Sequence, residues 1–264
     1  SLQSSASATR TFGTLDNLSM QRRPPTVLRA TMTVLAAELR ALRKHPSGYL
    51  FSVFLFAVVA EVGGAEADAY GSTSVLTAGG VAINALPAVT LLTCLFLLFV
   101  IVESLYRDRA TGFDAIALSS PVPTTAFIAG KALATLVVVT VFTAVCIASG
   151  SILVLAQSDR AVSLWPLVLV FGAVLGPTYI VWTAFVTAVM SVVQSRTTAL
   201  AIGFVALLLT AAQFIRGGLT WVTNWPLWGA LRWTEFAVFP LDGYALLLNR
   251  MLALGLALAF FAAA

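Results

Sequence analysis

Charged side chains are scarce in this sequence. Asp, Glu, Lys and Arg make up 10% of the 264 residues, whereas 59% are apolar and the mean hydropathy is +0.96. A soluble domain has about 25% charged and about 45–50% apolar residues. A soluble fold of this length would expose too much apolar surface to water, whereas lipid does not penalise that exposure. The composition therefore excludes a soluble enzyme domain and predicts an integral membrane protein.

Residues that usually carry chemistry are also few. His45 is the single histidine, and the two cysteines, Cys94 and Cys146, lie in apolar runs. One histidine cannot build a metal site, and thiols in such runs indicate packing and not a disulfide framework. The sequence has no GxxxxGK[ST] phosphate-binding loop, no Gly-x-Ser-x-Gly nucleophile elbow and no His/Glu zinc pattern. We therefore expect no enzyme activity, no ATP hydrolysis by this chain alone, and no metal or cofactor in it.

Long apolar runs fill most of the sequence. A helix needs about 20 apolar residues to cross about 30 Å of hydrocarbon. The runs predict an all-α, polytopic membrane protein with about six transmembrane helices, near residues 49–63, 81–103, 127–155, 164–193, 198–215 and 250–264. We expect residues 29–264 to form one membrane domain. Because the last run is short, we also expect the natural chain to continue past residue 264 and this sequence to be a fragment of a longer one.

Two different segments precede the first predicted span. Residues 1–28 are rich in Ser, Thr, Arg and Pro and lack a hydrophobic stretch, which predicts a disordered, basic cytoplasmic tail and not a signal peptide. Residues 29–44 place apolar side chains at helical spacing, with charged side chains around them. This pattern predicts an amphipathic elbow helix that lies in the membrane interface. A solvated helix packed on a cytosolic domain is the alternative.

Basic residues are unevenly distributed along the chain. The first 44 residues hold seven Arg or Lys, and a cytoplasmic N-terminus places eleven of the 15 on the cytoplasmic side. This bias follows the positive-inside rule. We therefore expect a multi-pass protein of the cell membrane, such as a bacterial inner membrane, whose basic end is attracted to membrane lipids. A nucleic-acid-binding arm is the rival interpretation; no nucleic acid is expected among the partners, because no fold for binding one follows.

The predicted loop between the second and third spans gathers charge. Glu103 and Arg107 are spaced as an i, i+4 pair of opposite sign, which favours a helix that continues out of the second span. Two interpretations stay open at this point: an amphipathic element on which a cytosolic partner pushes, or an ordinary solvated loop. The candidate residues are Glu103, Tyr106, Arg107, Asp108, Arg109, Gly112, Asp114 and, at the start of the third span, Lys131.

The order of these features resembles the permease subunits of ABC-2 type ATP-binding-cassette transporters. Those proteins have an N-terminal elbow helix, six spans, and a loop after the second span with Glu and Arg charges, a Gly, a Ser-Pro and then a Gly-Lys. The corresponding residues here are Glu103, Arg107, Asp108, Gly112, Ser120-Pro121 and Gly130-Lys131. The family usually has Glu-Arg-Glu and then a Gly within a few residues, whereas this chain has Tyr-Arg-Asp-Arg-Ala-Thr-Gly.

This resemblance implies a function and a set of partners. In the family, the loop contacts the ATPase and transmits its closure to the membrane domain. The resemblance therefore implies that residues 103–114, with Lys131 close by, couple this chain to an ABC ATPase subunit that binds ATP and Mg. It also implies a second permease half, either a second copy or a heterologous half, and export of a substrate.

Aromatic residues crowd the predicted connection 216–248. Trp221, Trp225, Trp228 and Trp233 are four of the six tryptophans, and Glu235 lies among them. Tryptophan favours the membrane interface, where its ring is buried and its N–H is wet. We expect one or two short interfacial or re-entrant helices on the extracytoplasmic side. They would form either an aromatic belt or a lid over a substrate exit.

Two other function classes stay open. A secondary transporter would need ionisable groups at mid-membrane and often has paired repeats; Glu61 is the one candidate, and no internal repeat is visible. Gradient-driven transport without an ATPase would favour it. A membrane-embedded scaffold or enzyme would need its polar groups gathered at the interface, and the sequence leaves them scattered.

Overall fold

The computed structural model describes residues 26–68, 77–112, 124–157, 163–234, 237–238 and 243–264. In chain order its elements are α1 (Val27–Lys44), α2 (Ser47–Asp68), α3 (Ala78–Ala110), α5 (Thr124–Gln157), α6 (Trp165–Leu167), the π-helix η2 (Val168–Val174), α7 (Gly176–Val193), α8 (Arg196–Ile215), β1 (Trp233–Thr234), β2 (Ala237–Val238) and α9 (Gly243–Ala263). The predicted Asp114 and Glu235, and the tail up to residue 25, lie outside the described residues.

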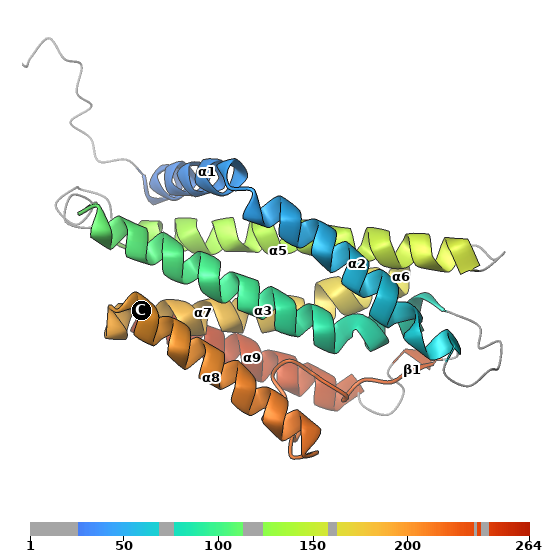
Figure 1. Ribbon diagram of the computed structural model, residues 1–264. Coiled ribbons are helices and arrows are strands. Elements are labelled where there is room, and N and C mark those ends of the chain that lie inside the picture. The colour runs from blue at the N-terminus through green and yellow to red at the C-terminus, as the bar shows by residue number, and fades with distance from the viewer. Residues whose placement is uncertain (1–25, 69–76, 113–123, 158–162, 235–236, 239–242) are drawn as a thin grey trace, which may run out of the picture.

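Six helical units in the described ranges are long and apolar enough to cross a membrane. They are α2, α3, α5, the continuous unit α6–η2–α7, α8 and α9. This confirms the predicted all-α polytopic fold, to which β1 and β2 add only a two-residue antiparallel pair. Figure 1 shows the long helices running side by side, with neighbouring ones tilted against each other.

The last span differs from its predicted position. It begins at Gly243, not near residue 250, and has 21 residues, which is enough to cross a bilayer. Asn249 and Arg250 interrupt the apolar run in the sequence, so the predicted span did not include residues 243–249, which precede Arg250. In the structure both side chains are buried inside the helical bundle, where protein groups satisfy them.

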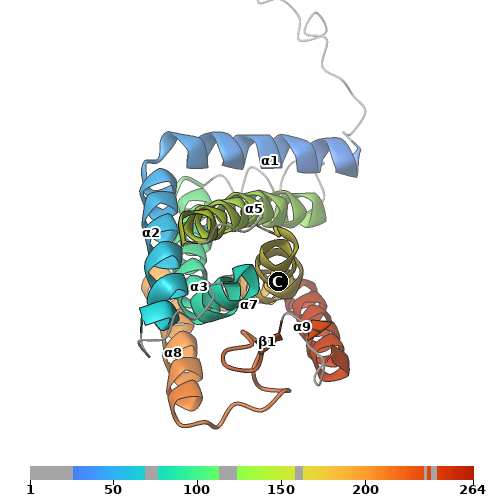
Figure 2. The same ribbon diagram turned by 90° about the vertical axis from the view of Figure 1, so that its right-hand side faces the viewer.

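The elbow helix α1 lies across the bundle, roughly perpendicular to the spans (Figure 2). The Thr26 hydroxyl caps its start by accepting a hydrogen bond from the Arg29 amide at 3.4 Å. It packs closely on α5 because Gly130 has no side chain: a Cβ there would lie 2.6 Å from Val34 Cβ and 3.0 Å from the Thr31 carbonyl oxygen. We call this end of the bundle, where α3 ends and α5 begins, the elbow end, and the other the far end.

The fourth span is interrupted near its middle. Residues Val168–Val174 form a π-helix, in which the Leu175 amide donates to the Val170 carbonyl at 3.1 Å. Pro177, in the first turn of α7, has no N–H to donate to the preceding turn. Such interruptions free backbone carbonyls for other donors and often occur at functional positions. Val174 is one residue whose carbonyl is used in this way, as described below.

The spans form a centre and a periphery. In the most apolar 18-residue stretch of α3 and of the α6–η2–α7 unit more than half of the residues are buried, against less than a quarter in the corresponding stretches of α2, α8 and α9. Figure 2 shows α3 and α7 in the middle, with α8 and α9 on opposite sides of them. The buried side chains of the central helices form one apolar core, which includes Leu97, Phe171 and Met190.

Candidate functional site

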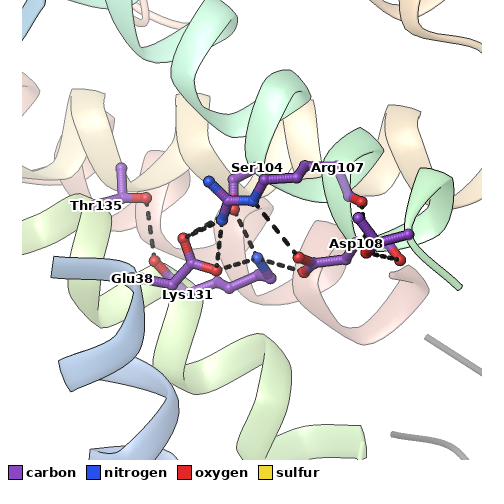
Figure 3. Close-up of polar contacts among 7 residues, drawn as sticks. Glu38, Ser104, Arg107, Asp108, Lys131 and Thr135 are labelled. Atoms are coloured by element: carbon purple, nitrogen blue, oxygen red, sulfur yellow. Dashed lines mark hydrogen bonds and ion pairs between the residues drawn. The ribbon is translucent and has the colours of Figure 1, made fainter. Parts of the chain in front are cut away.

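A cluster of charged side chains joins three elements at the elbow end. Glu38 comes from the middle of α1, Ser104, Arg107 and Asp108 come from the last turns of α3, and Lys131 comes from the second turn of α5. Figure 3 shows Glu38, Ser104 and Asp108 around the Lys131 ammonium group, and Arg107 in contact with the two carboxylates. We call these five residues the elbow cluster.

Lys131 is the centre of the elbow cluster. Its Nζ lies 2.5 Å from Glu38 Oε1, 2.7 Å from Asp108 Oδ2 and 2.6 Å from Ser104 Oγ (Figure 3). The contacts with Glu38 and Ser104 are hydrogen bonds, and the contact with Asp108 is an ion pair. Ser104 links Lys131 to Glu38 a second time, because its hydroxyl accepts from Lys131 and donates to Glu38 Oε2 at 3.1 Å. Lys131 and Glu38 are each 9% exposed, so these contacts are shielded from water.

Arg107 connects the buried part of the elbow cluster with the surface. Its Nη2 lies 3.2 Å from Glu38 Oε2, and its Nε lies 3.9 Å from Asp108 Oδ1. The Arg107 side chain is 45% exposed. Two carboxylates are thus balanced by two cations, and only one of the cations reaches the surface. A buried set of this kind tolerates the loss of one member poorly, because a charge is then left without a partner.

The remaining predicted coupling residues lie beside the elbow cluster and not in it. Arg109 Nη1 donates to the Met190 carbonyl at 3.0 Å, in the last turn of α7. Glu103 pairs with Arg196 at the start of α8, at 3.1 Å, and both side chains are about half exposed. Tyr106 lies beneath that guanidinium, 5.9 Å from ring centroid to Cζ. These contacts link the end of α3 to the turn between α7 and α8.

The helix continues out of the second span to Ala110, as the spacing of Glu103 and Arg107 predicted, but the two side chains do not pair with each other, since each turns to another helix. Glu103 binds Arg196, and Arg107 binds Glu38. An exposed i, i+4 pair contributes only about 0.3–0.5 kcal/mol, which contacts to neighbouring helices easily exceed.

Gly112 lies just after α3 with a φ of +67°, the left-handed conformation with which glycine ends helices.

Sequence reasoning missed Glu38 and Ser104. A signal for Glu38 was present: it lies three residues after Leu35 and four before Leu42, on the apolar side of the predicted elbow helix. A carboxylate on an apolar stripe indicates a buried partner. Ser104 carries no such signal, because a serine near a helix end is usually solvated or hydrogen-bonded to its own backbone.

A small cavity of about 30 Å³ adjoins the elbow cluster. Its lining is mostly apolar and includes five polar side chains, those of Glu38, Ser104, Lys131, Thr135 and Thr187, together with Thr183 of α7. The Thr183 hydroxyl is buried and has no hydrogen-bond partner among the described residues. A cavity of this size has room for about one or two waters beside these polar groups. The elbow cluster therefore borders a small space that elements α1, α3, α5 and α7 enclose together.

The Trp-rich segment after α8 folds as a series of turns, so the expected short helices are absent from its described part, residues 216–234. Glycine and proline explain the difference: Gly217 and Gly229 have positive φ, and Pro226 precedes Leu227, which has a φ of +58°. The Asn224 side chain supplies hydrogen bonds to backbone groups that a helix would have satisfied. Its side chain accepts from the Trp228 amide and donates to the Trp228 carbonyl, both at 2.9 Å.

The four tryptophans of this segment share the far end but are packed differently. Trp225 stacks on Trp182 of α7, with ring centroids 5.4 Å apart and an interplanar angle of 4°. Trp228 is buried, and Trp233 packs over Gly79 at the start of α3. Trp221 is half-buried against the core, and its carbonyl accepts a hydrogen bond from Asn249. These rings therefore form part of the protein interior and not only a belt toward lipid.

Arg250 of α9 fastens the Trp-rich segment to the interrupted span. Its Nη1 donates to the Val174 carbonyl at 3.0 Å and to Thr178 Oγ1 at 2.7 Å, and its Nη2 donates to the Trp225 carbonyl at 2.8 Å. Nε and Nη2 also donate to Asn249 Oδ1, the former at 3.0 Å. A guanidinium has five N–H donors, so these bonds use all of them.

No protein-family model matches the chain, and no curated protein matches its sequence. Within the described ranges, no group of three or more His, Cys, Asp or Glu side chains is placed to hold a metal ion. The function is therefore inferred from the membrane fold and from the elbow cluster.

Proposed function

We propose that this chain is the membrane permease subunit of an ABC transporter, driven by ATP hydrolysis on a partner ATPase. The elbow cluster is the observation that carries the proposal. It joins the elbow helix to the ends of two spans, and its Arg107, with Glu103 and Tyr106 beside the cluster, offers an exposed surface that carries charge. A six-span membrane protein with such a surface fits a partner that pushes on it from outside the bilayer.

In this proposal the elbow cluster transmits force. An ATPase that binds the end of α3 moves Arg107 and Asp108, and Lys131 and Glu38 carry the movement to α5 and α1. Buried charge pairs suit this role because they hold one geometry and do not slide like apolar contacts. Arg109 and the pair of Glu103 with Arg196 extend the same movement to α7 and α8.

The distribution of charge supports a cytoplasmic elbow end in the cell membrane. Of the 11 Lys and Arg in the described ranges, eight lie at the elbow end: Arg29, Arg40, Arg43, Lys44, Arg107, Arg109, Lys131 and Arg196. This is the bias of cytoplasmic ends in membrane proteins. ATP and Mg would be bound by the partner, and a second permease half, identical or heterologous, would complete the pathway for the exported substrate.

Secondary transport has less support. Glu61, its candidate residue, is exposed on α2 at the far end. Arg250 is an ionisable side chain buried within the span α9, but its five donors all bind protein acceptors and leave none for a substrate.

The proposal is tested by ATP hydrolysis in the complex of the full chain with its ATPase, reconstituted in nanodiscs. We expect Arg107→Ala to reduce ATPase activity about tenfold or more, because the contact surface and the link to Glu38 are both lost. Arg40→Ala, which removes an exposed positive charge of α1 outside the elbow cluster, serves as the matched control and should leave the activity within about twofold. A chain that purifies from its native membrane without a nucleotide-hydrolysing subunit would contradict the proposal, as would equal activities of the two variants.

A further inference from the structure

An apolar groove opens on the surface between α1, α2 and α5. Its volume is about 270 Å³, and Leu39 and Leu42 of α1 and Val137, Val138 and Val141 of α5 form its walls. Val137 and Val141 are 40% and 51% exposed. Since α2 and α5 are candidate membrane spans, these side chains face the region that lipid occupies.

The floor of the groove is rigid. Phe96 of α3 and Phe142 of α5 lie there, with ring centroids 5.2 Å apart in an edge-to-face arrangement. Phe51 of α2 stacks on Phe96 at 4.4 Å and fixes that ring from the other side. Packed aromatic rings keep their geometry, so the groove is formed in advance and not by collapse of loose side chains.

One end of the groove is basic. Arg43 lines it, and Lys44 follows at the end of α1; both side chains are exposed. The Tyr49 hydroxyl donates to the Arg43 carbonyl at 3.4 Å, which holds the corner between α1 and α2. No carboxylate in the described part of the chain forms an ion pair with either cation. The apolar walls and this pair of cations lie where a bilayer changes from acyl chains to headgroups.

We propose that this groove binds an anionic phospholipid, with an acyl chain on the aromatic floor and the phosphate at Arg43 and Lys44. Charge complementarity decides the occupant, because a neutral apolar helix would leave two unpaired cations at the rim. Arginine binds phosphate oxygens through paired N–H donors, and each basic residue near an anionic surface favours binding. The bound lipid would fasten the elbow helix to α2 and α5. This inference requires only insertion in a membrane, so it stands or fails separately from the ATPase partnership.

The test is native mass spectrometry of the full chain in detergent, titrated with dioleoyl phosphatidylglycerol or with dioleoyl phosphatidylcholine. We expect the anionic lipid to bind about tenfold more tightly than the zwitterionic one. The double variant Arg43→Gln/Lys44→Gln should lose about that factor for the anionic lipid alone. Arg29→Gln/Arg40→Gln removes the same charge from exposed positions of the same helix outside the groove and should change binding less than about twofold.

A second pair of variants separates the groove from general attraction to charge. Val141→Trp fills the groove and should weaken retention of the anionic lipid, whereas Val205→Trp, at an equally exposed valine of α8, should not. The inference is overturned if both lipids bind equally, if the charge variants match each other, or if the two tryptophan variants retain the lipid alike.

Discussion

Replacing Lys131 with methionine is expected to lower the free energy of unfolding by about 3–5 kcal/mol. The substitution keeps the length of the side chain but removes the ammonium group that binds Glu38 at 2.5 Å and Asp108 at 2.7 Å. Both carboxylates are then left with little access to water. Arg107 alone cannot replace the contacts that Lys131 makes with Glu38, Asp108 and Ser104. Denaturant unfolding in detergent micelles, followed by tryptophan fluorescence, measures the effect.

The matched control is Arg196→Met, which breaks the half-exposed pair with Glu103. An exposed pair of this kind contributes about 0.2–1 kcal/mol, so the control should lose far less. A triple variant with Leu at positions 38, 108 and 131 should regain much of the stability, because no buried charge remains. If Lys131→Met loses no more than Arg196→Met, the elbow cluster does not hold the three elements together.

Replacing Arg250 with methionine is expected to loosen the Trp-rich segment and to lower the free energy of unfolding by at least about 3 kcal/mol. The change removes the donors that Arg250 supplies to the Val174 carbonyl and to the side-chain oxygen of Asn249, and each such buried group costs about 1–3 kcal/mol. The Trp225 carbonyl keeps only the bond from the Thr178 hydroxyl. The stacking of Trp225 on Trp182 should weaken as well. Denaturant unfolding gives the stability, and near-ultraviolet circular dichroism reports on the ring pair.

Arg250→Lys distinguishes geometry from charge. Lysine keeps the positive charge but offers three donors, and it lacks the planar fork that reaches α7 and the Trp-rich segment together. We expect an intermediate loss for this variant and almost none for Arg216→Met, which removes an exposed arginine at the far end. Wild-type stability in Arg250→Lys would show that the five-donor arrangement is not needed.

The helical spans could be predicted from the sequence because each depends on a local property, the length of an apolar run. The same property failed at α9, where Asn249 and Arg250 interrupt the run although the helix continues through them. It also failed to indicate the π-helix Val168–Val174, since the sequence there is uniformly apolar and only tertiary packing decides between the α and π forms.

The candidate site was predicted in part, and the missing part is its long-range pairing. Arg107, Asp108 and Lys131 stood out as charges in a sequence that has few. Glu38, which binds both Arg107 and Lys131, lies in another element far from them in sequence. Arg250 was overlooked for the same reason, because its acceptors on Val174, Thr178 and Trp225 are separated from it in sequence and meet it only after α7 and α9 have packed.

Accessibility of single cysteines from the two sides of the membrane tests the central claim, that the helices span a bilayer with the elbow end in the cytoplasm. The native Cys94 and Cys146 are buried and should not react. Thr223→Cys places a thiol at an exposed position of the far end, and Thr111→Cys places one at the exposed end of α3. In intact bacterial cells, a membrane-impermeant maleimide should label the cysteine at position 223 but reach the one at position 111 only after the cells are permeabilised. Labelling of both positions in intact cells, or of position 111 alone, would contradict this account.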